Sequence, residues 1–269
     1  MSKIAIINES TLVTNDQVIA MVSAIQIQLN EHVLPAWNMK TCEVKFYANK
    51  AAAPGSSWIV DILDDSTQAG ALGYHSLDND RVDAFIFASP VLSNGGAVLV
   101  FDPNNPTQYT VSATLSHEVC EMIGDRYANS FCLGPQLSGG NLFCQELCDP
   151  VEALSYGINV GGVQVSVSNF VFPSFFNPEA VSPQNLPFDY LNQLSTPFSM
   201  AVGGYQIIAT LTNEGQITSD QGQVSAKLST KLVFGAKMPQ WRRDYVMGAY
   251  YRGYQRNSAG RSLRRGSRN

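Results

Sequence analysis

The sequence predicts an α+β protein: a twisted mixed sheet with two main helices, then a β-rich, loop-rich C-terminal lobe and a basic tail. Three observations lead to this fold class. Short β-type runs fill the first hundred residues, two segments have apolar residues at helical spacing, and the composition changes sharply near the end. With 269 residues, 45% of them hydrophobic, the chain can bury a core of its own. We expect lobes at 1–127 and 128–238 and an arm at 239–269.

Apolar runs bounded by Gly, Asp, Asn and Pro predict five strands in the first lobe. They are Lys3–Asn8, Cys42–Ala48, Trp58–Leu63, Asp83–Ala88 and Ala97–Phe101. A helix is expected after the first strand, up to about His32, because Thr14 and Gln17 have the spacing of a capping box.

The second helix is expected at 110–125. Its apolar residues share one broad face at 100° per residue, and His117 and Glu121 fall on the opposite side. Gly124 is a natural helix stop. The apolar face consists of Val111, Leu115, Val119, Met122 and Ile123.

The C-terminal lobe contains two expected strand pairs. Tyr156–Val160 and Val163–Val167 flank two glycines, a pattern typical of a two-residue hairpin turn. A second pair is expected from Tyr205–Thr212 and Gln223–Val233, with the turn at 213–215.

The residues with the clearest chemical meaning lie on the second helix. His117 and Glu121 are four residues apart, so their side chains project from adjacent turns and can bind one cation together. Imidazole and carboxylate are both ordinary zinc ligands, and Glu118 is placed to act as a general base toward water. The alternative is that these polar groups form a solvated helix face.

A third metal ligand is needed, and the acidic run at 148–152 is the preferred source. Asp149 is favoured within it because Pro150 favours an extended, rigid backbone. Asp125, His75 and a cysteine stay open as alternatives.

The segment Ser116–Asp125 resembles the metzincin zinc-peptidase signature H-E-x-x-H-x-x-G-x-x-H/D. His117, Glu118 and Gly124 match it, whereas Glu121 replaces the second histidine and Tyr127 stands at the third ligand position. The order of strand, helix, further strands and site helix is also similar to that clan. The resemblance implies a zinc-dependent, peptidase-like hydrolase. The added charge of Glu121 would weaken the Lewis acidity of the metal, so activity is expected to be reduced or absent.

A second resemblance covers about residues 70 to 210. The fragments GYH at 73–75, SHEVCEMIGD at 116–125, ELCDPVE at 146–152 and NFVFPSFF at 169–176 look like a set in uncharacterised phage and bacterial proteins with an HExxE core. This resemblance brings no reaction with it, but it makes a virion a plausible setting.

The cysteine pattern and the missing motifs argue against several classes of protein and of binding site. Five cysteines without an export-type leader favour reduced thiols, and Cys132, Cys144 and Cys148 lack the close pair of common structural zinc sites. The chain has no G-x-S-x-G elbow, no phosphate-binding G-x-x-x-x-G-K-[ST] loop and no apolar run long enough for a membrane helix. We expect a cytoplasmic protein, or a virion component if the chain is phage-encoded, without a membrane partner.

The last segment of the chain differs from the rest in charge and composition. Residues 1–240 carry a net charge of −12, and residues 241–269 carry +7, with interleaved tyrosines. Arginine binds phosphates and tyrosine stacks on bases, so we expect a contact arm for nucleic acid or an acidic protein surface. A solubilising, disordered tail is the alternative. Such an arm rarely orders alone, which favours a multi-chain assembly. Its arginines are Arg242, Arg243, Arg252, Arg256, Arg261, Arg264, Arg265 and Arg268.

Two functions are therefore expected. One is a zinc-dependent hydrolase in which His117, Glu121 and Asp149 hold the metal and Glu118 activates water. The other is a structural component of a phage particle that keeps a degenerate hydrolase fold and uses the arm for binding.

Overall fold

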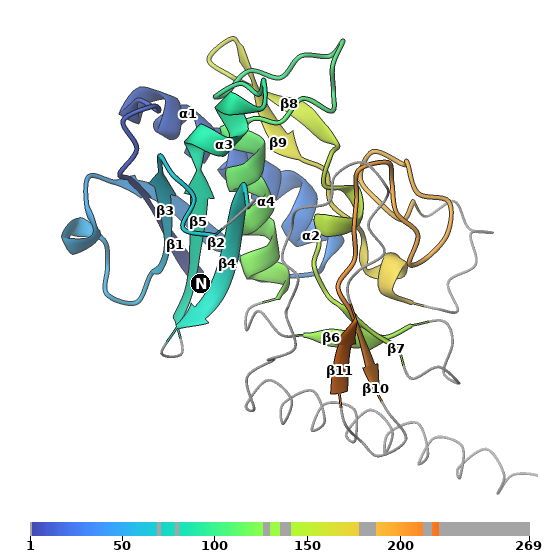
Figure 1. Ribbon diagram of the computed structural model, residues 1–269. Helices are drawn as coiled ribbons and strands as arrows, with labels where there is room; N and C mark the ends of the chain where they lie inside the picture. Colours follow the sequence, from blue (N-terminus) through green and yellow to red (C-terminus); the bar gives the residue numbers. More distant parts are fainter. Residues whose placement is uncertain are drawn as a thin grey trace, which may run out of the picture.

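The computed structural model (Figure 1) describes residues 2–68, 71–78, 81–125, 130–134, 141–177, 187–211 and 217–220. The expected strand Gln223–Val233 and the arm at 239–269, with all its arginines, lie outside these residues.

The larger sheet has five strands in the order β2-β1-β3-β5-β4. Four are parallel, and the edge strand β4 runs antiparallel to β5. The sheet is therefore mixed, as expected. The strands are β1 (Ser2–Asn8), β2 (Cys42–Tyr47), β3 (Trp58–Leu63), β4 (Gly73–Asp78) and β5 (Arg81–Phe87).

Two helices of 14 residues accompany this sheet: α1 (Asn15–Gln28) and α4 (Val111–Gly124). The predicted capping box at the start of α1 is confirmed, with Thr14 and Gln17 exchanging both hydrogen bonds. The helical path continues beyond α1 as a π-helical turn and then a short α-helix. These and the other short helical segments are η1 (Leu29–Val33), α2 (Leu34–Ala36), η2 (Lys50–Ala52), α3 (Ala88–Ser93), η4 (Asp149–Val151) and η5 (Pro173–Phe176).

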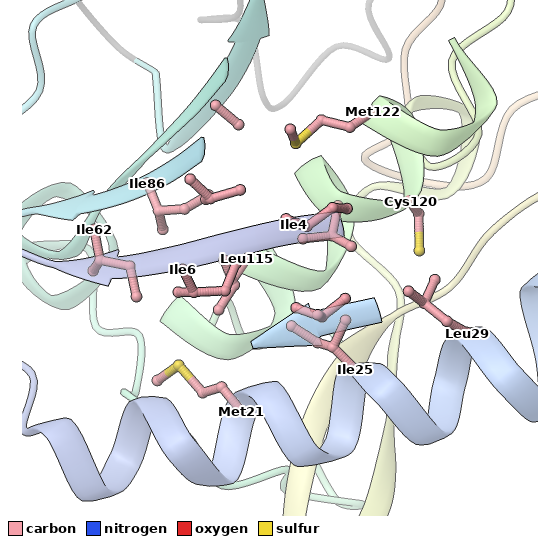
Figure 2. Close-up of a cluster of buried hydrophobic side chains, with 14 of the residues drawn as sticks. Ile4, Ile6, Met21, Ile25, Leu29, Ile62, Ile86, Leu115, Cys120 and Met122 are labelled. Carbon is pink, nitrogen blue, oxygen red and sulfur yellow. The ribbon is translucent and has the colours of Figure 1, made fainter. Parts of the chain in front are cut away.

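The main core lies between one face of the sheet and these two helices. Ile4 and Ile6 of β1 pack in this core with Met21 of α1 and Leu115 of α4 (Figure 2). The alternate residues of β1, including Ile7, belong to a separate cluster. This two-residue alternation explains why the four central residues of β1, from Ile4 to Ile7, are all apolar: both faces of the strand are buried there.

The second half of the described chain adds two antiparallel units. The hairpin of β8 (Ser155–Val160) and β9 (Val163–Ser168) turns at two glycines with φ of +59° and +90°, as expected, and β9 contacts α4. A four-stranded sheet has the order β11-β10-β7-β6. Its strands are β6 (Phe131–Leu133), β7 (Asn141–Cys144), β10 (Ile208–Leu211) and β11 (Ile217–Asp220). Within the described ranges, no helix combines the length and apolarity that a membrane crossing requires.

Several predicted elements differ from the structure. The run Ala97–Phe101 is not a strand but forms isolated bridges, because its backbone hydrogen-bonds to the start of α4 at one end and to β9 at the other. The sequence missed β4, α3, β6 and β7, and Ala88 begins α3 rather than ending a strand. The strand that pairs with β10 is β11, which the sequence did not predict.

Candidate metal centre

Three elements that are far apart in the sequence bring their polar side chains together. Strand β4 contributes one histidine, α4 contributes four residues up to its C-cap, and the segment after β7 contributes two carboxylates. The residues are His75; His117, Glu118, Glu121 and Asp125; and Glu146 and Asp149.

The predicted metal ligands do converge. The Nε2 atom of His117 lies 2.8 Å from Oε1 of Glu121 and 3.1 Å from Oδ1 of Asp149. The ligand atoms of the three side chains all lie within 4.8 Å of one another, and each residue is buried. This buried His/Glu/Asp triad could hold a metal ion.

Burial on both sides of α4 decides against a solvated polar face. The apolar side of the helix packs in the main core, while its polar side faces His75 of β4 and Asp149 of the segment after β7. Glu118 and Glu121 are only 1% and 2% exposed. Carboxylates this deeply buried need a cation, a proton or several hydrogen bonds.

Asp149 reaches the site by a different backbone route from the one expected. It begins the 3₁₀ turn η4 rather than an extended segment, with Pro150 in the first turn. The Tyr205 hydroxyl donates to Oδ1 of Asp149, and the Tyr205 backbone N–H donates to the Asp149 carbonyl at 2.9 Å. Tyr205, which the sequence did not single out, thus fixes the position of this carboxylate.

His75 extends the cluster on its far side. Its Nδ1 atom lies 3.4 Å from Oε2 of Glu118 and 3.6 Å from Oε2 of Glu121, and its Nε2 atom lies 3.8 Å from Oε2 of Glu146. His75 and Asp125 had been left open as ligands, whereas Glu146 was not proposed. The only signal for Glu146 was its place in the acidic fragment ELCDPVE.

The electrostatics of the cluster are dominated by negative charge. Five carboxylates and two histidines are gathered in it, and the buried polar residues among those described include no lysine or arginine. Burial raises the pKa of Glu146 well above its ordinary value, against the lowering effect of His75 and with a further rise from Glu121. Burial alone would lower the pKa of His75, but the surrounding carboxylates hold it well above its usual value.

The cysteines are all free thiols. Among the described residues, none of the groups that could hold a metal contains a cysteine. Cys144 lies beside the cluster, and its S–H donates to Oε1 of Glu146 at 3.3 Å. Burial raises the pKa of this thiol, so it is a neutral donor at physiological pH.

A small pocket gives access to the centre from the side of β4. His117 and Glu118 line it together with Gly73, Tyr109, Thr114 and Glu152. Gly73 leaves room there, because a Cβ at this position would lie 2.9 Å from Oε1 of Glu118. Glu118 therefore borders both the cluster and the pocket.

Gly124 permits the other close approach. A Cβ at this position would lie 2.0 Å from Cδ1 of Leu147, which packs against the end of α4. Since Leu147 lies between Glu146 and Asp149 in the sequence, this contact brings both carboxylates to the helix. Tyr127, at the third ligand position of the metzincin pattern, lies outside the described residues.

No family model, curated protein or solved structure matches this chain. The fold and the site define its class: a mixed α/β protein with a buried His/Glu/Asp cluster that could hold a metal ion.

Proposed function

We propose that this chain is a metal-dependent hydrolase of the peptidase type, with zinc as the expected metal. His117, Glu121 and Asp149 hold the ion, and Glu118 is the general base. The observation that carries the proposal is the position of the His117 Nε2 atom, buried between two carboxylate oxygens at 2.8 and 3.1 Å.

The donor set fits a zinc ion. One imidazole nitrogen and two carboxylate oxygens leave a fourth position open, as in catalytic zinc sites. Two ligands on a tetrahedral zinc are about 3.3 Å apart. The distances of 2.8 and 3.1 Å from His117 would therefore increase by only a few tenths of an ångström. The hydrogen bond from Tyr205 to Asp149 is the kind of support that orients ligating carboxylates. When bound, the cation would polarise a substrate carbonyl and acidify water in the site.

The position of Glu118 supports its role. It follows the ligand His117 directly, and both side chains border the same pocket. Its Oε1 atom lies on the side of Gly73, at the pocket wall, while Oε2 faces His75. A water molecule in the pocket can therefore transfer a proton to Glu118, which can pass it on to a leaving amine.

The order of elements supports the resemblance to metzincins. The helix with His117 and Glu118 follows a mixed sheet, as the resemblance implies. The carboxylate of Glu121 in place of an imidazole adds negative charge to the ion, so slow hydrolysis is expected.

Elemental analysis tests the metal. Untagged protein is expected to contain zinc, and His117→Ala is expected to lose the ion held by the His117, Glu121 and Asp149 triad. Zinc below about a tenth of an equivalent in the wild type, unchanged in the variant, would contradict the proposal.

Two matched variants test the catalytic role. Glu118→Gln and Glu152→Gln make the same chemical change in the same pocket, but only Glu118 belongs to the cluster. We expect Glu118→Gln to retain metal and lose peptide hydrolysis by about 10²-fold or more, while Glu152→Gln keeps both. Equal activity in the two variants would remove Glu118 from the mechanism.

A second proposal concerns the segment after Pro239 and rests on composition. Eight arginines against one aspartate, with interleaved tyrosines, favour binding of nucleic acid or of an acidic surface within a multi-chain particle. This activity is compatible with a hydrolase body.

A further inference from the structure

We propose that the protein has a second cation site, formed by His75, Asp125 and Glu146 and adjoining the first. It goes beyond the proposed hydrolase, for which one metal ion is sufficient. The two sites share no ligand, because the first consists of His117, Glu121 and Asp149.

The two side chains at the centre of this site are buried and incompletely satisfied. The His75 and Glu146 side chains are 5% and 10% exposed. Among the described residues, neither Nε2 of His75 nor Oε2 of Glu146 has a hydrogen-bond partner. Buried polar atoms of this kind are rare and call for a ligand.

The spacing of these two atoms fits ligands of one ion better than it fits a hydrogen bond. They lie 3.8 Å apart, beyond the hydrogen-bond limit. Two ligands at about 2.1 Å from a shared cation are roughly 3.3–3.6 Å apart at tetrahedral to trigonal angles. A carboxylate oxygen of Asp125 completes the group, in which one ligand atom from each of the three residues lies within 4.8 Å of the other two.

The neighbours of the three ligands hold them in position. The Ser130 backbone N–H donates to Asp125 at 3.0 Å, and the Cys144 S–H donates to Oε1 of Glu146. Oε2 of Glu146 therefore stays available to a cation. This is the outer support that ligating carboxylates have in metal proteins.

His75 also has the orientation of a metal ligand. Its Nδ1 atom faces carboxylate oxygens of Glu118 and Glu121 at 3.4 and 3.6 Å. With an ion in the site, a proton on Nδ1 would be directed at these carboxylates, and Nε2 would face the ion and Glu146. Ligating histidines usually present one nitrogen to the metal and donate the other N–H to a carboxylate. His75 thus connects the two sites.

The acidic character of the cluster is compatible with more than one cation. Five buried carboxylates are gathered here, and the buried polar residues among those described include no lysine or arginine. A divalent cation at each site would offset part of the negative charge of its ligands. One imidazole with two carboxylates suits Zn²⁺ or Mn²⁺.

Metal stoichiometry of the full chain tests the second site. Protein stripped with a chelator is reloaded with Zn²⁺ or, separately, Mn²⁺, desalted and analysed for bound metal. We expect about two equivalents in the wild type, about one in Glu146→Gln, about one in His117→Ala and none in the double variant. Glu152→Gln, a glutamate outside both sites, is the matched control and is expected to bind about two equivalents.

The outcomes separate this proposal from the previous one. One equivalent in the wild type, lost in His117→Ala and kept in Glu146→Gln, would overturn the second site and leave the hydrolase site standing. If the wild type binds one equivalent and only Glu146→Gln loses it, the second site would stand and the proposed hydrolase site would be overturned. Metal-edge anomalous diffraction from wild-type crystals decides independently of how the variants fold: a peak beside Nε2 of His75 is expected, and its absence from metal-soaked crystals overturns the proposal.

Discussion

The contact between Gly124 and Leu147 gives the sharpest test of how the fold builds the site. In Gly124→Ala the new methyl group would lie 2.0 Å from Cδ1 and 2.8 Å from Cδ2 of Leu147. Carbon atoms in contact are about 3.5–4.0 Å apart, so the Leu147 side chain, together with the buried segment that carries it, must give way by about 1.5–2 Å. Glu146 and Asp149 flank Leu147 and would move with it, whereas ligand distances at a metal tolerate only about 0.2 Å.

Two opposing effects set the size of the change in stability. Overpacking a filled core costs about 1–3 kcal/mol, and replacing a helical glycine by alanine returns up to about 1 kcal/mol. We expect a net loss of about 1–2 kcal/mol in the free energy of unfolding, or about 2–8 °C in Tm, for the metal-free protein. Metal affinity is expected to fall by about tenfold or more. Circular dichroism measures Tm, and competition with a chromophoric chelator measures affinity.

Leu147→Ala provides the control. Alone it leaves a cavity and is expected to cost about 2–5 kcal/mol. Combined with Gly124→Ala, it gives the new methyl group space. The loss in the free energy of unfolding of the double variant should therefore be smaller than the sum of the two single losses by about 0.5–3 kcal/mol. Strict additivity, or a Gly124→Ala protein with unchanged Tm and metal affinity, would refute this account of how the segment is held.

Bound metal, the charge of Glu121, the burial of Cys132 and the basic arm can each be tested separately. Chelation of a metal present at about a thousand times its Kd should remove about 4 kcal/mol of stability, seen as a fall in Tm of about 8–16 °C; an unchanged Tm would argue against bound metal. Glu121→His restores a neutral second imidazole and should raise hydrolysis of a peptide substrate about tenfold, the effect of about 1.4 kcal/mol on the barrier, whereas Glu121→Gln should not. Burial raises the pKa of Cys132 to about 12, so iodoacetamide at pH 8 should alkylate it about a thousand times more slowly in the native protein than an ordinary thiol of pKa 9, and equal native and unfolded rates by mass spectrometry would contradict this. A chain ending at Pro239 should keep its circular dichroism spectrum but lose salt-sensitive nucleic-acid binding, and equal binding by the trimmed and full chains would remove the arm from that role.

Local patterns predicted the elements that local forces determine. The Thr14 capping box, the apolar strands β1 and β3 and the helical spacing of α4 all depend on residues close in sequence, and all are confirmed. The i, i+4 spacing of His117 and Glu121 is also a local feature, so their proximity could be predicted from the sequence.

What the sequence did not predict depends on distant contacts. Strand β4 has no β-branched residue, and it is held in the sheet by its pairing with β5. His75 reaches the cluster only through that pairing. Glu146 reaches it from a segment that is held by the packing of Leu147 on Gly124 and by backbone hydrogen bonds to distant residues. The run Ala97–Phe101 has a β-type composition, but its hydrogen-bond partners change along its length.

The wide separation of the contributing elements along the chain has a consequence for biogenesis. When α4 emerges during synthesis, the chain already contains His75 but lacks Glu146 and Asp149. These carboxylates follow about thirty residues after His117, and Tyr205, which orients Asp149, later still. Neither of the two proposed sites can therefore be complete until the chain is long enough to close on itself.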